Sequence, residues 1–290
     1  MKHSRLVVVA VLVVACSIAT RAQWPAYPTP DLPRTADGEV RLDAPAPRTA
    51  AGRPDLSGIW MNFRASDREG ELEGGRGRSV NSAFFDETPP GLIGLFRNIG
   101  QGVEGGLPFQ PWAAELRAAR MATNSRDNPD AHCLPIGLMQ YHTHPDPRRI
   151  VQTSRLVVIA YESNYGLRTI FLDGRPAPDN DPQPWWYGYS RGWWEGDTLV
   201  VETTHFRDGG WLDIDGSPLT DAATVTERFR RPTVGSLEIE IMVNDPKAYT
   251  RPWTVQVNQR LMPDTELIEF ICNENQRFGL RDPDRLIPGG

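Results

Sequence analysis

The sequence contains very little lysine. Lys2 and Lys247 are the only two lysines among 290 residues, and the other basic residues are arginines scattered along the chain. Nucleic-acid binding requires clustered basic residues, and attraction to an anionic membrane surface requires a polybasic patch. Neither is present, and the formal net charge of the whole chain is −6. We therefore expect no nucleic-acid partner.

Long hydrophobic runs are also absent, except at the N-terminus. Two basic residues there precede an apolar stretch over residues 6–18, which is too short to span a bilayer and is typical of a secretory signal. A small-x-small cleavage site ends at Ala22, so residues 1–22 are predicted to be removed. In the alternative, the signal ends before Cys16, which then carries a lipid anchor. Both alternatives predict a periplasmic or secreted protein without a membrane span.

Cysteine is scarce. Of the three cysteines, Cys16 is removed or lipidated, which leaves Cys133 and Cys272 as a pair in an oxidising compartment. We predict a disulfide between them, which would close a loop of about 140 residues and stabilise the fold by on the order of 4 kcal/mol. A catalytic thiol is the weaker alternative, because a free nucleophilic cysteine is readily oxidised in that compartment.

Signatures of several enzyme classes are missing. The sequence has no Walker loop, CxxC or HExxH motif, and no recognisable Ser/His/Asp signature. These absences disfavour nucleotide-binding, redox and serine-hydrolase functions. We predict no cofactor, with a divalent metal as the alternative.

The rest of the chain predicts one β domain behind an extended arm. Residues 23–55 are rich in Pro, Ala, Arg and Asp, which predicts an arm or linker. Residues 56–290 are predicted to form a single β-barrel domain, with long N-terminal loops and one short helix over residues 111–123. From residue 150 onward, strands follow one another through short turns. This pattern predicts a mainly β fold, an antiparallel meander that closes into a barrel of about eight to ten strands.

The segment Gly192–Thr203, GWWEGDTLVVET, predicts a β-hairpin inside this meander. Gly196 supplies the backbone freedom that a tight turn needs, and acidic residues are expected beside such a turn. We therefore interpret Glu195 and Asp197 as turn residues and not as a paired-carboxylate site.

Strand alternation places several charged side chains on apolar faces. Glu227 shares its face with Val225 and Phe229, and an unpaired charge buried there would cost several kcal/mol. By the same alternation we predict three further inward charges, Arg168, Glu162 and Glu202. The structural interpretation is an Arg–Glu network that fixes strand register. The functional interpretation is a polar floor in an apolar pocket, with Glu227 or Glu162 as a base and Arg168 holding an oxygen of the substrate.

Histidines form a second candidate cluster. The stretch QYHTHPD places His142, His144 and Asp146 close together in a predicted loop, where they could form part of a metal site completed by His132 or His205. A solvated loop is the simpler interpretation, because this spacing matches no established metal motif. Acid–base chemistry by His142, His144 or His205 is the third interpretation.

Aromatic residues gather between residues 185 and 194. Large aromatics are mostly core residues, but the surplus here leaves some available to stack on a ligand. The ligand-binding candidates are Trp186, Tyr189, Trp194, Glu202 and Tyr141.

Motifs along most of the chain after residue 53 resemble a broad, uncharacterised family of secreted bacterial proteins. They are PDLSGIW (54–60), CLPIG (133–137), DGRPAP (173–178), GYSRGWWEGDTLVVET (188–203), ERFRR (227–231), DPKAYTRPW (245–253) and EFICNEN (269–275). The resemblance implies a lipocalin-like β-barrel and supports the pairing of Cys133 with Cys272. It implies no catalytic residues. Family members often have a Met- or Pro-rich stretch where this chain has QYHTHPD.

These observations favour an extracytoplasmic barrel that takes a small, partly apolar organic molecule into its lumen. We predict cofactor-independent acid–base chemistry of the lyase, isomerase or hydrolase type. A non-catalytic small-ligand-binding protein of the same fold is the first alternative. A metal-dependent enzyme that uses His142 and His144 is the second, and a structural module with a lumen packed by side chains is the third.

Overall fold

The computed structural model describes residues 28–62, 96–179 and 184–272. The predicted signal over residues 1–22, with Cys16, lies outside these ranges. The strands are β1 (Gly58–Asn62), β2 (Arg148–Gln152), β3 (Leu156–Tyr161), β4 (Leu167–Phe171), β5 (Tyr189–Glu195), β6 (Thr198–Thr204), β7 (Gly210–Trp211), β8 (Pro218–Leu219), β9 (Thr224–Arg230), β10 (Ser236–Asn244) and β11 (Trp253–Leu261). The helices are α2 (Pro111–Ala122) and α3 (Leu138–Thr143), with 3-10 turns η3 (Ile99–Gly102), η4 (Pro129–His132) and η5 (Ser163–Tyr165).

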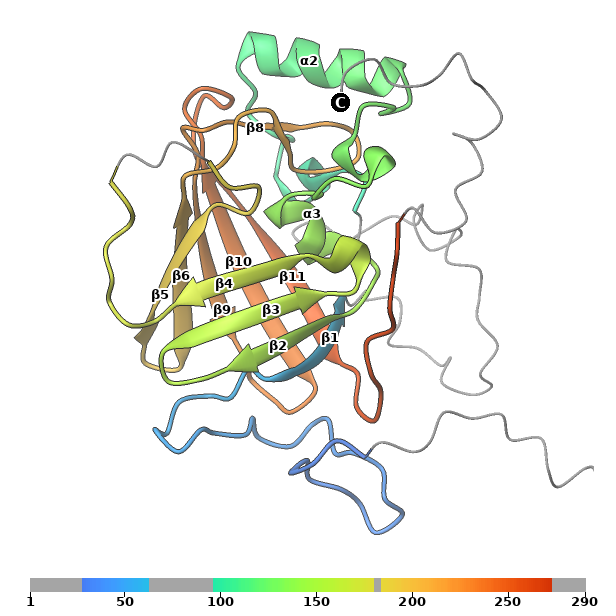
Figure 1. The fold of residues 1–290 in the computed structure, drawn as a ribbon, viewed down its shortest axis with the longest axis vertical. Coiled ribbons are helices and arrows are strands. Elements are labelled where there is room, and N and C mark those ends of the chain that lie inside the picture. Colours follow the sequence, from blue (N-terminus) through green and yellow to red (C-terminus); the bar gives the residue numbers. More distant parts are fainter. Residues whose placement is uncertain (1–27, 63–95, 180–183, 273–290) are drawn as a thin grey trace, which may run out of the picture.

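Nine of these strands form a closed barrel, which confirms the predicted fold class (Figure 1). The strand order around the barrel is β1-β11-β10-β9-β6-β5-β4-β3-β2, and β2 pairs with β1 to complete the circle. The strands β7 and β8 form a separate two-stranded sheet. Along β9 and β10 every second residue is buried, which is the alternation expected of strands with one face on a core.

The barrel departs from a simple antiparallel meander in two places. β4 and β5 pair in parallel, whereas all the other neighbouring pairs of the barrel are antiparallel. A parallel pair needs a crossover connection, here the chain between Phe171 and Tyr189. In addition, β1 closes the barrel between β2 and β11, far from both in sequence.

The helices lie at one end of the barrel. The predicted helix over residues 111–123 is α2, which begins at Pro111 and lies across that end in Figure 1. The segment with His142 was expected to be a loop, but residues 138–143 form the short helix α3, and all six of its residues are buried. A six-residue helix has too little periodicity to be predicted. Its burial in the barrel end stabilises it instead.

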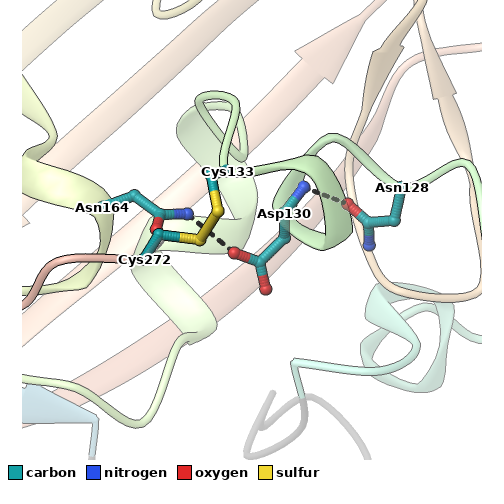
Figure 2. Close-up of a disulfide and its surroundings, with 5 residues drawn as sticks. All are labelled: Asn128, Asp130, Cys133, Asn164 and Cys272. Atoms are coloured by element: carbon teal, nitrogen blue, oxygen red, sulfur yellow. Dashed lines mark hydrogen bonds between the residues drawn. A yellow bond between two sulfur atoms is a disulfide. The ribbon is translucent and has the colours of Figure 1, made fainter. Parts of the chain in front are cut away.

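The predicted disulfide between Cys133 and Cys272 is present, with a Cα–Cα distance of 5.6 Å. Figure 2 shows it beside Asp130, whose carboxylate accepts a hydrogen bond of 2.7 Å from Asn164 Nδ2. The disulfide joins the end of η4 to the chain that follows β11. Among the residues that the structure describes, no helix is both long enough and apolar enough to cross a membrane.

Candidate functional site

A buried ion pair lies in the middle of the barrel. Glu227 projects inward from β9 between Val225 and Phe229, as its alternation predicts, and is fully buried. Arg168 projects inward from β4, and its Nη1 donates a hydrogen bond of 2.9 Å to Glu227 Oε1. Its Nη2 contacts the second carboxylate oxygen of Glu227. The two charges therefore meet in a bidentate pair, the strongest arrangement for these groups.

Two hydroxyl groups complete the surroundings of Arg168. Its Nε donates to Ser190 Oγ at 3.1 Å, and its Nη2 donates to Thr203 Oγ1 at 2.9 Å. Ser190 and Thr203 face each other across β5 and β6, and their hydroxyl oxygens are 3.0 Å apart. The guanidinium is therefore hydrogen-bonded along all three of its nitrogen atoms. Such saturation leaves it little capacity to hold a substrate oxygen as well.

His142 is the third ionisable member of this cluster. It reaches into the lumen from α3, and its Nε2 lies 2.6 Å from Glu227 Oε1. Among the described residues, its Nδ1 has no hydrogen-bond partner although it is buried. We call Arg168, Glu227, His142, Ser190 and Thr203 the lumen network.

The pKa values explain the charges in the lumen network. Burial alone would raise the pKa of Glu227, but Arg168 and the hydrogen bond to His142 outweigh it and lower the pKa to about 2. Burial lowers the pKa of His142 below its usual value, against the opposing attraction of Glu227. At neutral pH the carboxylate is therefore ionised and the imidazole is neutral. Because Nε2 contacts the carboxylate, it carries the proton, and Nδ1 presents a lone pair.

Contacts of its C-terminal half hold α3 in the barrel. Arg148, buried on β2, donates from Nη1 to the carbonyl oxygen of His142 at 3.2 Å and from Nη2 to that of His144 at 3.4 Å. Tyr141 stacks on Tyr161 with ring centroids 4.1 Å apart. A Cβ added at Gly166 would lie 2.6 Å from the Tyr141 hydroxyl oxygen, so glycine is needed there for this close approach.

Side chains fill the middle of the lumen. Arg168 is 2% exposed, His142 and Tyr141 are each 1% exposed, and Glu227 is 0% exposed. A ligand therefore does not reach these groups in this arrangement. A carboxylate with a pKa of about 2 is also a weak base near neutral pH. In this arrangement Glu227 orients His142, and Nδ1 of His142 is the better placed base.

Two of the predicted inward carboxylates lie outside the barrel, so their assignment to the lumen is wrong. Glu162 follows β3 and accepts a hydrogen bond of 2.9 Å from the backbone N–H of Ile268. Glu202 pairs with Arg191 on the neighbouring strand, at 2.6 Å, with both side chains about one-third exposed. Both β3 and β6 carry apolar residues on consecutive positions. Alternation therefore could not identify which face of these two strands points inward.

The structure does not bring the aromatic candidates together. Tyr189 stacks on Phe171, with ring centroids 5.3 Å apart, and Trp186 lies under Arg207. His205 hydrogen-bonds to Thr204 beside Tyr189. Trp194 packs against the core from β5. Tyr141 alone among these candidates belongs to the surroundings of the lumen network, and its hydroxyl group lies 3.1 Å from that of Tyr187.

The two histidines of QYHTHPD have different partners. His142 contacts Glu227, whereas His144 Nδ1 lies 3.2 Å from Asp146 Oδ2. His144 Nε2 lies 3.5 Å from Ser163 Oγ, so this pair joins the end of α3 to η5. Within the described ranges, no group of three or more His, Cys, Asp or Glu side chains is placed to hold a metal ion.

A groove of about 460 Å³ lies outside the lumen, against β1 and β2. Residues 28–30 form one wall, and the chain after β11 forms another. Figure 1 shows the chain after β11 running beside β1. We call this the arm groove. Its apolar lining comes from Pro28, Pro30, Ile59, Ile150, Leu261 and Met262. Its volume falls within the range of small-ligand pockets.

Sequence reasoning missed several polar residues of the lumen. Ser190 and Thr203 lie on inward positions of β5 and β6, in register with one another. A polar residue at an inward position could have been detected in the sequence, but a hydroxyl group interrupts an apolar face less clearly than a charged group does. Arg148 was missed because strands were expected only from residue 150 onward, whereas β2 begins at Arg148. Tyr161 was missed because alternation placed its neighbour Glu162 on the inner face, whereas Tyr161 is the buried one.

Comparisons of the chain with known protein families, with curated proteins and with solved structures found no match in any of the three. The closed barrel is consistent with the lipocalin-like architecture that the sequence motifs imply.

Proposed function

We propose that this protein is a small-ligand-binding barrel protein that holds a partly apolar organic molecule in the arm groove. The observation that carries the proposal is the groove itself, a hollow of about 460 Å³ with apolar walls from four segments of the chain. Ligand pockets are typically mostly apolar, with a small number of polar groups that orient the ligand. The arm groove has this composition.

The lumen network also favours the arm groove, and not the lumen, as the ligand site. Its charged groups are buried and paired with one another, and buried ion pairs of this kind frequently serve structural roles. In the proposed function the lumen network fixes the register of β4, β5, β6 and β9 and anchors α3. The ligand therefore binds beside the barrel and not inside it.

We further propose that the protein acts outside the cytoplasm. The disulfide between Cys133 and Cys272 supports this, because such bonds persist in oxidising compartments. The predicted signal over residues 1–22, or the lipoprotein alternative at Cys16, supplies the route. Small organic ligands are the proposed partners.

The binding proposal is tested by blocking the groove. Thr265 lines it and is half-buried, so Thr265→Trp should place an indole in the ligand volume. Thr254→Trp is the matched control, because Thr254 is exposed on β11 and does not line the groove. Mass spectrometry of small molecules retained by each purified protein is the measurement. We expect retention by the wild type and the control, and loss from Thr265→Trp; equal retention by all three proteins would refute the proposal.

A second candidate function is acid–base catalysis in the lumen, favoured by the free Nδ1 of His142. Nε2 of His142 donates to Glu227, so the imidazole is held in the tautomer that a general base requires. This is the cofactor-independent lyase, isomerase or hydrolase chemistry expected from the sequence, with α3 as the element that must move.

The catalytic candidate has its own test. Purified protein is incubated with a bacterial metabolite extract, and mass changes are followed for the wild type, His142→Gln and His205→Gln. Turnover lost only in a folded His142→Gln protein would establish the catalytic role. No turnover by the wild type would remove it. Metal content, measured on the wild type and His144→Ala, tests the metal-dependent alternative.

A further inference from the structure

We infer that the ligand of the arm groove is a monocarboxylate with an apolar body, and that Arg149 holds its carboxylate. This inference rests on the proposed function, because it names the ligand class of the same groove. Among the described residues that line the groove, Arg149 is the cation and Glu266 is the carboxylate.

The position of Arg149 suits this task. It lies on β2 between the buried residues Arg148 and Ile150, so its own side chain projects to the outside of the barrel, where the groove lies. Ile59 of β1 pairs with Arg149 and is part of the apolar lining. A guanidinium at the edge of an apolar hollow matches a molecule with one charged head and an apolar body.

Glu266 occupies the place that such a head group would take. Its Oε2 contacts Arg149 Nη2, and the two side chains are 50% and 38% exposed. Ion pairs with this exposure contribute little to stability. A ligand carboxylate can therefore replace Glu266 on Arg149 with little loss, since the guanidinium exchanges one carboxylate for another and the apolar body gains burial.

The wall that carries Glu266 is held by other residues. Asp264, two positions earlier, accepts hydrogen bonds from the backbone N–H of Thr29 at 2.7 Å and from Arg34 Nη2 at 2.6 Å. Met262 N donates to the carbonyl oxygen of Ile59 at 2.8 Å. Further along, Glu162 holds Ile268. Displacement of the Glu266 side chain consequently leaves the backbone of this wall in place.

The charge of the groove also excludes other ligand classes. A phosphate or polyanion is usually held by several cations or by a helix N-terminus, whereas the lining of the arm groove supplies one arginine. A cationic ligand would have to displace Arg149, which is carried by strand β2, whereas an anionic ligand displaces Glu266, which lies in the chain after β11 and outside any strand. One negative charge on an apolar body is the composition that fits.

The test uses decanoate and decanol, which have the same chain and differ in the head group. Binding of each to the full mature protein is measured by isothermal titration calorimetry at neutral pH, at concentrations below aggregation. The proteins are the wild type, Arg149→Gln, Glu266→Gln and Arg155→Gln. Arg155 is the matched control, an exposed arginine near the end of β2 that does not line the groove.

We expect the wild type to bind decanoate more tightly than decanol. Arg149→Gln should weaken decanoate binding roughly tenfold, equivalent to about 1.4 kcal/mol, and leave decanol binding unchanged. Glu266→Gln should tighten decanoate binding, because the competing carboxylate is gone, and Arg155→Gln should change neither. Equal binding of both probes with no effect of Arg149→Gln would overturn this inference and leave the binding function standing. Failure of both probes with every protein would overturn the inference and count against the binding function as well.

Discussion

The barrel carries two arginine–glutamate pairs in opposite surroundings. The side chains of Arg168 and Glu227 are 1% and 0% exposed, and hydroxyl groups and an imidazole surround them. Arg149 and Glu266 are 38% and 50% exposed, at the edge of an apolar groove. The residue types are the same in both pairs, but their exposure to solvent differs. The buried pair cannot exchange partners without a large loss, whereas the exposed pair can.

This difference in exposure favours a structural role for the buried pair and a ligand-binding role for the exposed pair. A pair that must stay intact is suited to fixing strand register and to anchoring a short helix. A pair that opens at little cost is suited to receiving a ligand. The following experiments test that division, beginning with the largest expected effect.

Glu227→Gln should produce the largest loss. It leaves the charge of Arg168 buried and unpaired, which lowers the free energy of unfolding by about 3 to 5 kcal/mol. Urea unfolding followed by circular dichroism measures it. Glu238→Gln is the control, because Glu238 pairs with Arg230 on the outer face, with side chains 30% and 60% exposed, and should change stability by less than about 1 kcal/mol. Equal effects of the two variants would contradict the division.

Removal of the disulfide should have the next largest effect. Cys133 and Cys272 are 139 residues apart, and loss of such a cross-link lowers the free energy of unfolding by about 2 to 4 kcal/mol. Cys133→Ala with Cys272→Ala is compared with the wild type by urea unfolding. We also expect weaker decanol binding, because the bond holds the chain that continues from the groove wall. Unchanged binding would show that Asp264 and its partners suffice to hold that wall.

Acid should destabilise the protein in two steps. The pKa of His142 is lowered by burial from 6.5, so the unfolded chain binds the proton first. Stability is then full above about pH 6.5 and falls below it, by up to about 1.4 kcal/mol per pH unit. Glu227, with a pKa of about 2 against a usual 4.5, adds a second loss as the pH falls below 4.5. Unfolding free energies measured across this range test both steps.

His142→Gln provides the control for the first step. The variant has no imidazole to protonate, so the decline that begins near pH 6.5 should become shallower while the second step persists. An unchanged profile would mean that His142 is not the group responsible.

Arg149→Gln should have the smallest effect on stability. Its ion pair with Glu266 is exposed, so the free energy of unfolding should change by no more than about 1 kcal/mol, although decanoate binding falls. A loss as large as that of Glu227→Gln would show that the arm groove depends structurally on this pair.

The sequence predicted the barrel, and two of the four charged residues that it placed inside, Arg168 and Glu227, do lie there. Glu227 was placed correctly because β9 alternates cleanly, with Val225 and Phe229 on the buried face and Thr and Arg residues on the other. Arg168 was placed correctly by its shared face with Ile170, although β4 also carries Leu167 and Phe171 on its outer face. Glu162 and Glu202 were misplaced because Leu156–Ala160 and Leu199–Val201 are apolar on both faces. In such strands one face packs on the lumen and the other is covered in part by other segments, so polarity alone does not identify the inner face.

The groove and the position of His142 were beyond sequence reasoning for a different reason. The groove walls come from residues near 28, 59, 150 and 262, and no local pattern records that these segments meet. His142 reaches Glu227 only because six residues form a helix that the barrel end stabilises. Both features depend on contacts between distant parts of the chain.

The pairing of β1 with β11 has a consequence for how the protein folds. Residue 60 is among the first of the barrel to be synthesised, and its partner on β11, Leu261, is among the last. The loop between them must be closed before the barrel is complete, and such non-local contacts slow folding. The hairpins of β2 with β3, β5 with β6, and β9 with β10 can form earlier, because their partners are close in sequence. The barrel thus stays open, with unpaired strand edges, until its last strand arrives.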